Sequence, residues 1–265
     1  MDMEKGMRCG LNLFSLRKQI DTKEKFLATA KALKEMGYDY LQYSGGPWEP
    51  NTVKEVSEAV GLPVVLTHVK LDRMLNDPEK LVAEHKLFGC ENVGLGAFDF
   101  RGADEATRRE GIAKIGRAAE KISKAGANFF YHNHNFEFVK MESGKTVFDT
   151  IVTECPAVNF ILDTFWLQSG GVSIIEYIEK LKGRIGCVHL KDFLPFFVKN
   201  EETGKYESKP KFAPVGDGNI NWHSVIPAFV EAGAQYFLVE QDDATDYEEP
   251  LSQVARSIQY LKENF

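Results

Sequence analysis

Cysteine is scarce in this chain, and the four cysteines are scattered along it. Cys9, Cys90, Cys155 and Cys187 show none of the paired spacing that marks a disulfide framework or a zinc motif. Cys9 and Cys187 fall in predicted strands and Cys155 lies beside a predicted helix end. We therefore expect buried free thiols in a reducing compartment.

Long hydrophobic runs are also missing. No apolar stretch approaches the roughly 18 residues that a membrane-spanning helix needs. The first segment, Met1–Arg8, is charged rather than signal-like, although a leader removed earlier would leave no trace in this sequence. We expect a cytoplasmic protein with no membrane partner.

Positive charge is in deficit, because 32 lysines and arginines face 39 acidic residues and leave a net charge of −7. A phosphate backbone therefore has no overall electrostatic attraction to the chain, and we expect no nucleic-acid partner. No G-x-G-x-x-G loop joins a strand to a helix, which argues against a dinucleotide. No cluster of arginine and lysine marks a phosphate pocket, so an unphosphorylated small molecule is favoured.

A repeated unit of helix, glycine and strand organises the chain. In each copy an amphipathic helix ends at a glycine, which supplies the left-handed turn of a helix C-terminus, and a short apolar strand follows. The clear copies are Lys23–Met36 with Tyr38–Gln42, Val53–Val60 with Pro63–Thr67, Glu79–Phe88 with Asn92–Leu95, Thr107–Ala125 with Asn128–Tyr131, and Val225–Ala232 with Tyr236–Val239. Such alternation predicts parallel βαβ units.

Three more strands and three more helices complete eight units. The strands are Arg8–Phe14, Val158–Leu162 and Ile185–Val188, and the helices are Val147–Thr153, Ile174–Leu181 and Glu248–Lys262. Eight β/α units in sequence favour a closed (β/α)8 TIM barrel over an open sheet. We predict an α/β fold with one domain over residues 1–265 and no internal linker.

One long irregular stretch, Phe193–Asp217, follows the seventh predicted strand. Phenylalanines stand at both of its ends, and a charged segment, Lys199–Lys211, occupies its middle. Loops of this length in compact domains are usually functional. We interpret it as a β-hairpin, either a flap over the barrel mouth or a contact between subunits of a homo-oligomer.

Carboxylates and imidazoles stand at the carboxyl ends of four successive predicted strands. The polar run His132–Glu137 follows one strand, and Asp163, His189 and Glu240 follow the next three. Such groups are costly at the end of a strand buried on both faces unless something pairs them. In a TIM barrel these strand ends converge on the mouth that holds the active site. The residue types suit one divalent ion, Mn, Mg, Co or Zn, so we expect a metal site.

Five motifs in the second half of the chain carry a family resemblance. They are Tyr131-His132-Asn133-His134 with Glu137-Phe138, Leu162-Asp163, Val188-His189-Leu190-Lys191-Asp192, Val215–Trp222 and Val239-Glu240-Gln241-Asp242. In this order they resemble the xylose-isomerase-like TIM-barrel superfamily, in its sugar phosphate isomerase/epimerase branch. That superfamily includes ketose epimerases, inosose dehydratases, 3-keto-glycoside lyases and an abasic-site endonuclease, so the resemblance implies a metal enzyme and leaves the substrate open.

The resemblance implies three metal ligands, namely Asp163, His189 and Glu240. For the fourth, ketose 3-epimerases of the superfamily carry a glutamate about where this chain has Tyr131. We select Glu137, the nearest carboxylate, and keep His132 or His134 as the fallback.

The expected chemistry is removal of a proton next to a carbonyl that a divalent metal polarises. Glu240 and Glu137 are the candidate carboxylates for this step, and His132 and His134, on the same side of a strand, are acids or hydroxyl contacts. Return of the proton gives isomerisation or epimerisation, whereas loss of a β-oxygen gives dehydration or lyase cleavage. We favour a metal-dependent sugar isomerase or epimerase, with a 3-keto-glycoside lyase or inosose dehydratase as the alternative.

Four further residues are candidate substrate contacts. Lys191 is a donor to a sugar hydroxyl or phosphate, Trp166 is an apolar platform, and His68 and Arg17 face the same mouth. Each has a structural alternative, such as a surface ion pair between Lys191 and Asp192. A non-catalytic sugar-binding barrel and an abasic-site endonuclease are the other two function classes that we weigh against a carbohydrate enzyme.

Overall fold

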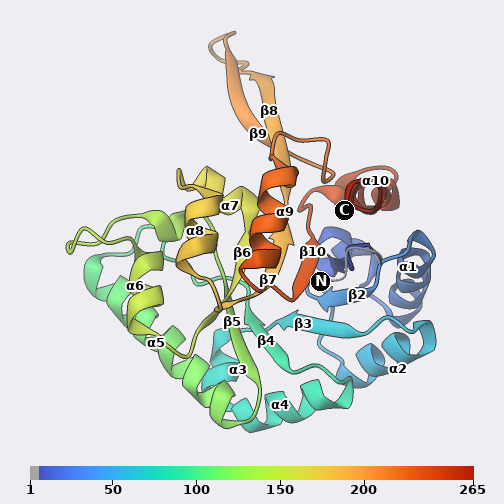
Figure 1. The fold of residues 1–265 in the computed structure, drawn as a ribbon, viewed down its shortest axis with the longest axis horizontal. Helices are drawn as coiled ribbons and strands as arrows, with labels where there is room; N and C mark the ends of the chain where they lie inside the picture. The colour runs from blue at the N-terminus through green and yellow to red at the C-terminus, as the bar shows by residue number, and fades with distance from the viewer. Residues whose placement is uncertain (1–5) are drawn as a thin grey trace.

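A closed barrel of eight parallel strands forms the body of the protein (Figure 1). The structure is a computed structural model that describes residues 6–265, so most of the charged segment Met1–Arg8 lies outside it. Around the barrel the strands follow the order β1-β10-β7-β6-β5-β4-β3-β2. Their bounds are β1 Gly10–Asn12, β2 Tyr40–Tyr43, β3 Val64–His68, β4 Asn92–Leu95, β5 Asn128–His132, β6 Asn159–Asp163, β7 Ile185–Leu190 and β10 Tyr236–Val239. The predicted TIM barrel is confirmed.

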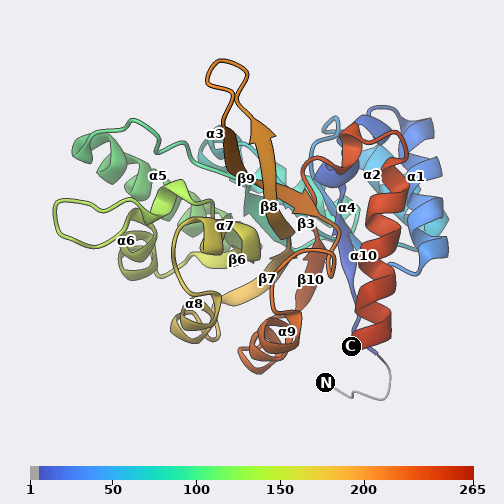
Figure 2. The ribbon, with the colours of Figure 1, turned by 90° about the horizontal axis from the view of Figure 1, so that it is seen from above.

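Helices surround this barrel (Figure 2). They are α1 Lys23–Met36, α2 Pro50–Val60, α3 Leu71–Asn76, α4 Pro78–Leu87, α5 Glu105–Lys124, α6 Val147–Glu154, α7 Thr164–Ser169, α8 Ile174–Lys180, α9 Trp222–Glu231 and α10 Pro250–Asn264. The six-residue helices α3 and α7 were not predicted, because six residues are too few to show a helical period. Within residues 6–265, none of the helices has the length and apolar character needed to cross a bilayer.

The first strand is shorter than the sequence predicts. Only Gly10–Asn12 pairs within the barrel, and Leu13–Gln19 forms the 3-10 helix η2 in place of the rest of the predicted strand Arg8–Phe14. The Asn12 side chain accepts a hydrogen bond from the Phe14 backbone N–H, which starts this turn. A capping side chain thus ends the strand although the residues after it are apolar.

Apolar side chains fill the barrel interior directly below the mouth. A small buried cluster contains Phe130, Ile161, Cys187 and Leu238, with Tyr40 and Leu66. Because side chains alternate along a strand, the residue two positions beyond each of the first four points to the same interior. Those residues are His132, Asp163, His189 and Glu240. All four cysteines are buried and free, as predicted.

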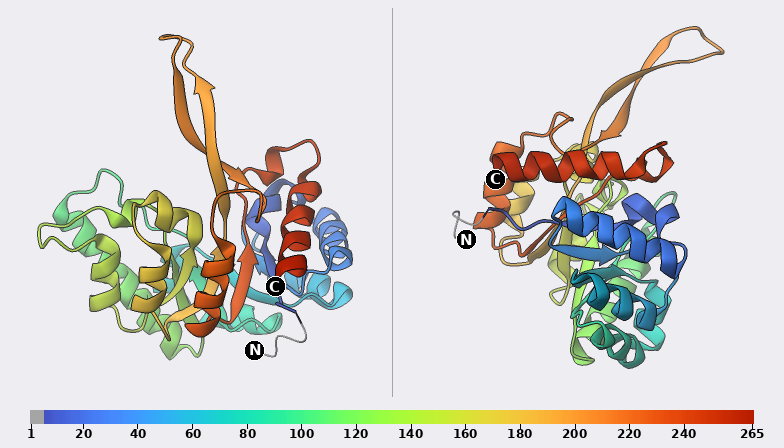
Figure 3. Two further views of the ribbon diagram at one scale, coloured as in Figure 1. Left: turned by 45° about the horizontal axis from the view of Figure 1, so that its top comes forward. Right: turned by 90° about the vertical axis from the view of Figure 1, so that its right-hand side faces the viewer.

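The long loop after β7 is a hairpin arm that projects away from the barrel (Figures 1 and 3). Its strands β8, Asp192–Lys199, and β9, Tyr206–Ala213, pair antiparallel along their whole length. Phe193 and Phe212 at its root each contact Phe165, with ring centroids 4.9 and 4.8 Å apart. The hairpin is therefore confirmed, and its outer half extends from the body rather than over the mouth.

The buried carboxylate of Asp192 anchors the root of this arm. It accepts hydrogen bonds from the backbone N–H groups of Phe193, Gly216, Gly218 and Ile220 and from the indole N–H of Trp222, at 2.7 to 3.2 Å. A Cβ on Gly218 would lie 2.1 Å from Asp192 Oδ1, so the turn needs glycine there. The surface ion pair between Lys191 and Asp192 that the sequence allowed is wrong, because both side chains are buried and point to different partners.

We predict that Asp192→Asn lowers the free energy of unfolding by about 2 to 4 kcal/mol, because an amide NH2 leaves several buried N–H donors unmatched. Guanidinium unfolding monitored by circular dichroism measures the change. The matched control is Asp246→Asn, which removes an exposed carboxylate bound to Lys18 and is expected to change stability much less than Asp192→Asn does. Equal losses in the two variants would contradict the anchoring role of Asp192.

Candidate metal centre

Four buried polar side chains meet at the carboxyl ends of neighbouring strands. His132 ends β5, Asp163 ends β6, His189 lies near the end of β7, and Glu240 follows β10. Each offers one nitrogen or oxygen atom, and these atoms all lie within 4.8 Å of one another. The strands are consecutive in the order β10-β7-β6-β5, and Asp163 pairs directly with His189. Barrel closure, rather than proximity in sequence, thus brings the four together.

Hydrogen bonds on the far side of each imidazole fix which nitrogen faces this group. His132 Nδ1 lies 2.9 Å from the Gly96 carbonyl oxygen, which can only accept, so Nδ1 carries the hydrogen. Burial, followed by the neighbouring His189, lowers the pKa of His132 to about 3, so the ring is neutral and Nε2 keeps its lone pair. His189 Nε2 lies 2.7 Å from Gln42 Oε1, which leaves His189 Nδ1 facing the group. Such outer hydrogen bonds are typical of metal-binding histidines.

The inward-facing atoms are all acceptors placed against one another. His132 Nε2 lies 3.3 Å from Asp163 Oδ2, and His189 Nδ1 lies 2.6 Å from Glu240 Oε2. The last two atoms are buried and make no hydrogen bond of good geometry with any described residue. Two imidazole nitrogens and two carboxylate oxygens around one point fit a divalent cation such as Mn²⁺ or Zn²⁺.

The ammonium group of Lys191 supplies a positive charge beside these acceptors. Its Nζ lies 3.2 Å from Asp163 Oδ2, 3.5 Å from Glu240 Oε2 and 3.0 Å from Asp242 Oδ1, and the residue is only 1% exposed. Burial by itself lowers the pKa of Lys191, but the three carboxylates outweigh it and raise the pKa above its usual value. Lys191 is therefore charged, and its role is to compensate the carboxylates. Its Nζ already has three carboxylate partners before any substrate binds.

Glu137, selected from the sequence as the fourth ligand, is not part of this group. Its Oε1 accepts a 2.6 Å hydrogen bond from the Tyr131 hydroxyl, and its Oε2 accepts one of 2.8 Å from the His134 backbone N–H. The short helix η3, Phe136–Phe138, turns the side chain back under the loop. His132, the fallback, stands in its place. Glu137 instead holds the segment that carries both histidines.

Three candidate substrate contacts border the centre with unused polar atoms. His134 Nδ1, Trp166 Nε1 and His68 Nε2 are buried and have no hydrogen-bond partner among residues 6–265. The His134 ring lies 4.7 Å from the ring of His132 and 5.0 Å from that of Trp166, and His68 lies 5.5 Å from His132. Unpartnered buried donors and acceptors beside a polar centre are the groups that a hydroxylated ligand satisfies.

Arg17 is engaged elsewhere. Its guanidinium donates to the backbone oxygens of Phe14 and Asp242, at 3.1 and 2.7 Å, and lies near the carboxylate of Asp246. It joins the loop after β1 to the loop after β10. These contacts give Arg17 a structural role, and its predicted role as a substrate contact stays a prediction.

Sequence reasoning missed two residues that support the ligands. Gln42 orients His189, and the Asn133 side-chain oxygen accepts a 2.9 Å hydrogen bond from the Asp163 backbone N–H. Gln42 had a visible signal, because it is a polar residue inside the apolar strand Tyr40–Tyr43. Asn133 had none, since it is one of several polar residues in a loop.

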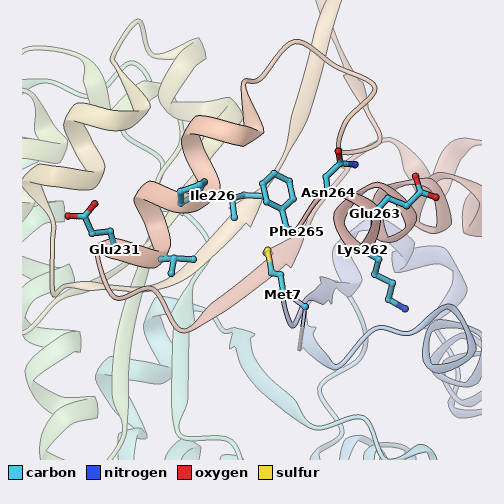
Figure 4. Close-up of a pocket in the computed structure, with 10 residues that line it drawn as sticks. Met7, Ile226, Glu231, Lys262, Glu263, Asn264 and Phe265 are labelled. Atoms are coloured by element: carbon cyan, nitrogen blue, oxygen red, sulfur yellow. The ribbon is translucent and has the colours of Figure 1, made fainter. Parts of the chain in front are cut away.

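An apolar cavity of about 540 Å³ lies at the opposite end of the molecule (Figure 4). Met7, Ile226, Val230 and Phe265 supply its apolar surface, between α9 and the end of α10. Met7 precedes β1, so the cavity is at the amino ends of the strands, where TIM barrels do not place their chemistry. The cluster at the carboxyl ends is the better candidate for a functional site.

Comparison with known proteins shows the family to which the barrel is similar. The family model described as "Xylose isomerase-like TIM barrel" matches residues 30–264. An inosose dehydratase of Clostridium botulinum (strain Alaska E43 / Type E3) is 28% identical over 180 residues, which cover 63% of this chain and 57% of that protein. An inosose dehydratase of Clostridium perfringens (strain 13 / Type A) is 26% identical over 164 residues, 59% and 54% of the two chains. The chain thus spans little more than half the length of these relatives.

Solved structures share the fold along nearly the whole chain. A sugar phosphate isomerase/epimerase of Parabacteroides distasonis ATCC 8503 superposes with a TM-score of 0.79 at 19% identity, over 100% of this chain and 96% of that one. A D-allulose 3-epimerase of Methylomonas sp. in complex with D-allulose gives 0.69 at 11% identity, with 98% of each chain covered. A xylose isomerase-like TIM barrel protein of Mycobacterium smegmatis in complex with magnesium gives 0.71 at 15%, over 99% and 98%. At these identities the likeness shows the fold alone.

The buried Glu137 carboxyl yields a pH-dependent prediction. Burial raises the pKa of Glu137 to about 7 from an ordinary value of 4.5, despite the hydrogen bonds that it accepts. A raised folded-state pKa favours the native state at low pH, and this advantage is lost as pH rises from about 4.5 to about 7. We therefore expect the unfolding free energy of the wild type minus that of Glu137→Gln to fall, by up to about 3 kcal/mol, between pH 4.5 and 8.

The measurement is guanidinium unfolding of both proteins across this pH range in the presence of a chelator, so that metal binding does not contribute. Glutamine does not titrate, and the difference between the proteins isolates residue 137 from every other ionisable group. A difference that stays constant or rises with pH would contradict the raised pKa.

Proposed function

Because the chain belongs to the xylose isomerase-like TIM barrel family, we propose that it is a metal-dependent enzyme that removes a proton next to a carbonyl of a carbohydrate or cyclitol. The observation that carries this proposal is the convergence of His132, Asp163, His189 and Glu240 at the barrel mouth. A bound divalent cation would polarise the substrate carbonyl and stabilise the negative charge that proton removal creates.

The proposed ligands are these four residues, with His132 in the place first given to Glu137. The supporting observations are the two oriented imidazoles and the acceptor atoms that face one another. Asp163 is held in position from both sides, since its backbone N–H donates to Asn133 and its Oδ1 accepts from the Trp166 N–H. Such outer contacts keep a ligand in its binding orientation.

Glu240 is the proposed base. Its carboxylate is nearly buried at the mouth, and burial raises its pKa while Lys191 and His189 outweigh this effect and hold the pKa well below its usual range. It is therefore ionised, which is the state that a general base needs before it takes a proton from carbon. His134 and Trp166 are proposed to bind substrate hydroxyls through their unpartnered ring nitrogens.

We propose that the reaction ends in elimination, the alternative that the sequence left beside a sugar isomerase or epimerase. After Glu240 removes the proton, the C–H electron pair forms a C=C bond, the β-carbon–oxygen bond breaks, and the leaving oxygen takes a proton. One carboxylate can serve both transfers on one face of the substrate, whereas epimerisation needs a second group on the opposite face. Glu137, the second carboxylate of the original hypothesis, is bound to Tyr131 and His134 instead. The inosose dehydratase relatives support the same outcome.

Epimerisation is the second candidate, and a specific feature favours it. His134 comes from the loop after β5 and Glu240 from the end of β10, so the two approach the centre from different strands. Burial, with the neighbouring His132, lowers the pKa of His134 to about 3, which leaves a neutral imidazole able to accept a proton. If His134 is this second base, His134→Gln abolishes epimerisation, whereas elimination through Glu240 alone continues.

The substrate is proposed to be unphosphorylated. Lys191 is neutralised by three carboxylates, and Arg17 is occupied by backbone oxygens and Asp246. Both side chains therefore already have hydrogen-bond or ionic partners, and neither is an unpartnered cation that would attract a phosphate group.

Metal titrations test the ligand set. We expect His132→Ala and Asp163→Asn to weaken Mn²⁺ binding by more than about 100-fold, beyond the effect of losing an outer contact. Glu137→Gln is the matched comparison, and we expect it to weaken binding by about tenfold or less. Isothermal titration calorimetry gives the affinities, and circular dichroism confirms folding. If Glu137→Gln loses as much affinity as His132→Ala, the assignment of His132 is wrong.

The reaction can be tested by proton NMR in D₂O. Mg-loaded protein is mixed in turn with each member of a panel of inososes, 3-keto-glycosides and ketoses. We expect an unsaturated product from at least one substrate, and a rate lowered by about 10²- to 10⁴-fold in Glu240→Gln. Glu207→Gln, on the exposed arm, is the control and should retain the full rate. A new epimer with deuterium beside the carbonyl would support the second candidate, and no reaction across the panel would contradict both.

A further inference from the structure

The outer half of the hairpin arm, residues 195–210, presents large apolar side chains to solvent. Phe197 is 68% exposed, Tyr206 72% and Phe196 47%. These exposed fractions are unusual for aromatic side chains, which are normally buried in a core or in an interface. The rest of the arm differs, because Phe193 and Phe212 at the root pack on the barrel.

Most of these side chains form one continuous strip. Residues that pair across two antiparallel strands lie on the same face of the hairpin, and so do the pairs two positions further along. The pairs Phe193–Phe212, Pro195–Pro210, Phe197–Ser208 and Lys199–Tyr206 therefore share a face. The strip begins at Phe212, whose ring lies 6.5 Å from that of Trp166, and runs outward to Tyr206. An isolated two-stranded hairpin of this kind gains little stability by itself in water, so a covering surface would stabilise it.

The edges of the arm discourage a partner that adds as another strand. Pro195 and Pro210 stand opposite each other, and neither can donate a backbone N–H. Charged side chains occupy every second position of β9, at Glu207, Lys209 and Lys211. Prolines and charges at an edge are the features that prevent continued strand addition. The contact surface is therefore the apolar face, rather than the edge.

The charge distribution favours a second copy of the same chain. The segment 194–211 carries four lysines and three glutamates, a net charge of +1. Because the whole chain has a net charge of −7, the rest of the chain has a net charge of −8. Two acidic bodies repel each other, whereas the arm of one copy meets no such repulsion from the other. Nothing in a nearly neutral arm favours a strongly charged partner such as a nucleic acid.

The area is also adequate for a dimer. At roughly 200 Å² for each aromatic side chain, the exposed parts of Phe197 and Tyr206, which lie on the strip, amount to about 280 Å² per arm. Two arms and the surfaces of the other copy that they cover give about 1,100 Å², above the roughly 1,000 Å² that a biological interface needs.

We propose that two copies of this chain form a symmetric dimer in which the outer half of each arm packs against the other copy. A two-fold contact is reciprocal, so the arm of each copy covers the same area on the body of the other. The proposal is independent of the reaction that the barrel catalyses. Since the strip starts beside Trp166, the partner also shields the side of the mouth from which the arm leaves.

Sedimentation velocity of the complete chain tests this dimer over a range of protein concentrations. We expect a species of twice the 29.9 kDa chain mass for the wild type. The double variant Phe197→Ser, Tyr206→Ser should weaken dimerisation by about 100-fold or more, because truncating buried aromatic anchors removes most of an interface's affinity. Both side chains are exposed, so circular dichroism and metal binding should be unchanged.

The matched control is Leu87→Ser, which removes an apolar side chain that is 47% exposed on α4, away from the arm. It should leave the dimer intact. A wild type that is monomeric at about 100 μM, or a double variant that dimerises as tightly as the wild type, overturns the proposal. A monomer that cosediments with phosphatidylcholine vesicles through Phe197 and Tyr206 overturns it in favour of a membrane surface.

Discussion

A buried positive charge is the constraint on which the centre of the barrel depends. The strands deliver Asp163, Glu240 and Asp242 to one small volume, where three carboxylates without compensation would repel one another strongly. Lys191 lies within 3.5 Å of all three, so one ammonium group makes the arrangement stable in the absence of any other cation. The same placement suits a site that binds a metal, because the carboxylates outnumber the single ammonium group and their excess negative charge attracts a divalent cation.

The fold could be predicted from the sequence because every signal for it is local. Glycine after an amphipathic helix, and a short apolar strand after the glycine, recur along the chain, and Lys23–Met36, Asn92–Leu95 and Tyr236–Val239 were predicted with the observed bounds. The errors arise where a side chain overrides the pattern. Asn12 ends β1 early by capping η2, and Asp163 starts α7 by accepting from the Trp166 N–H. Neither bond is visible as periodicity.

The site was predicted in part for a related reason. His189 and Glu240 stand at strand ends and follow from the alternation of side chains. The exchange of Glu137 for His132 does not, since it depends on a hydrogen bond from Tyr131 that turns the carboxylate away. Asp192 is a similar case, because its partners lie more than 20 residues further along the chain. Long-range hydrogen bonds to one carboxylate leave no trace in sequence spacing.

Lys191 and Asp192 are consecutive residues whose side chains have different partners. Lys191 contacts the carboxylates of the centre, whereas Asp192 contacts residues at the root of the arm. Asp192 is the first residue of the arm, and four of the five hydrogen bonds that its carboxylate accepts come from residues 216–222. These hydrogen bonds fix the backbone where the arm leaves the barrel, one residue from the ammonium group of Lys191. The chain therefore places a protruding arm next to its buried cation with a firmly held turn between the two.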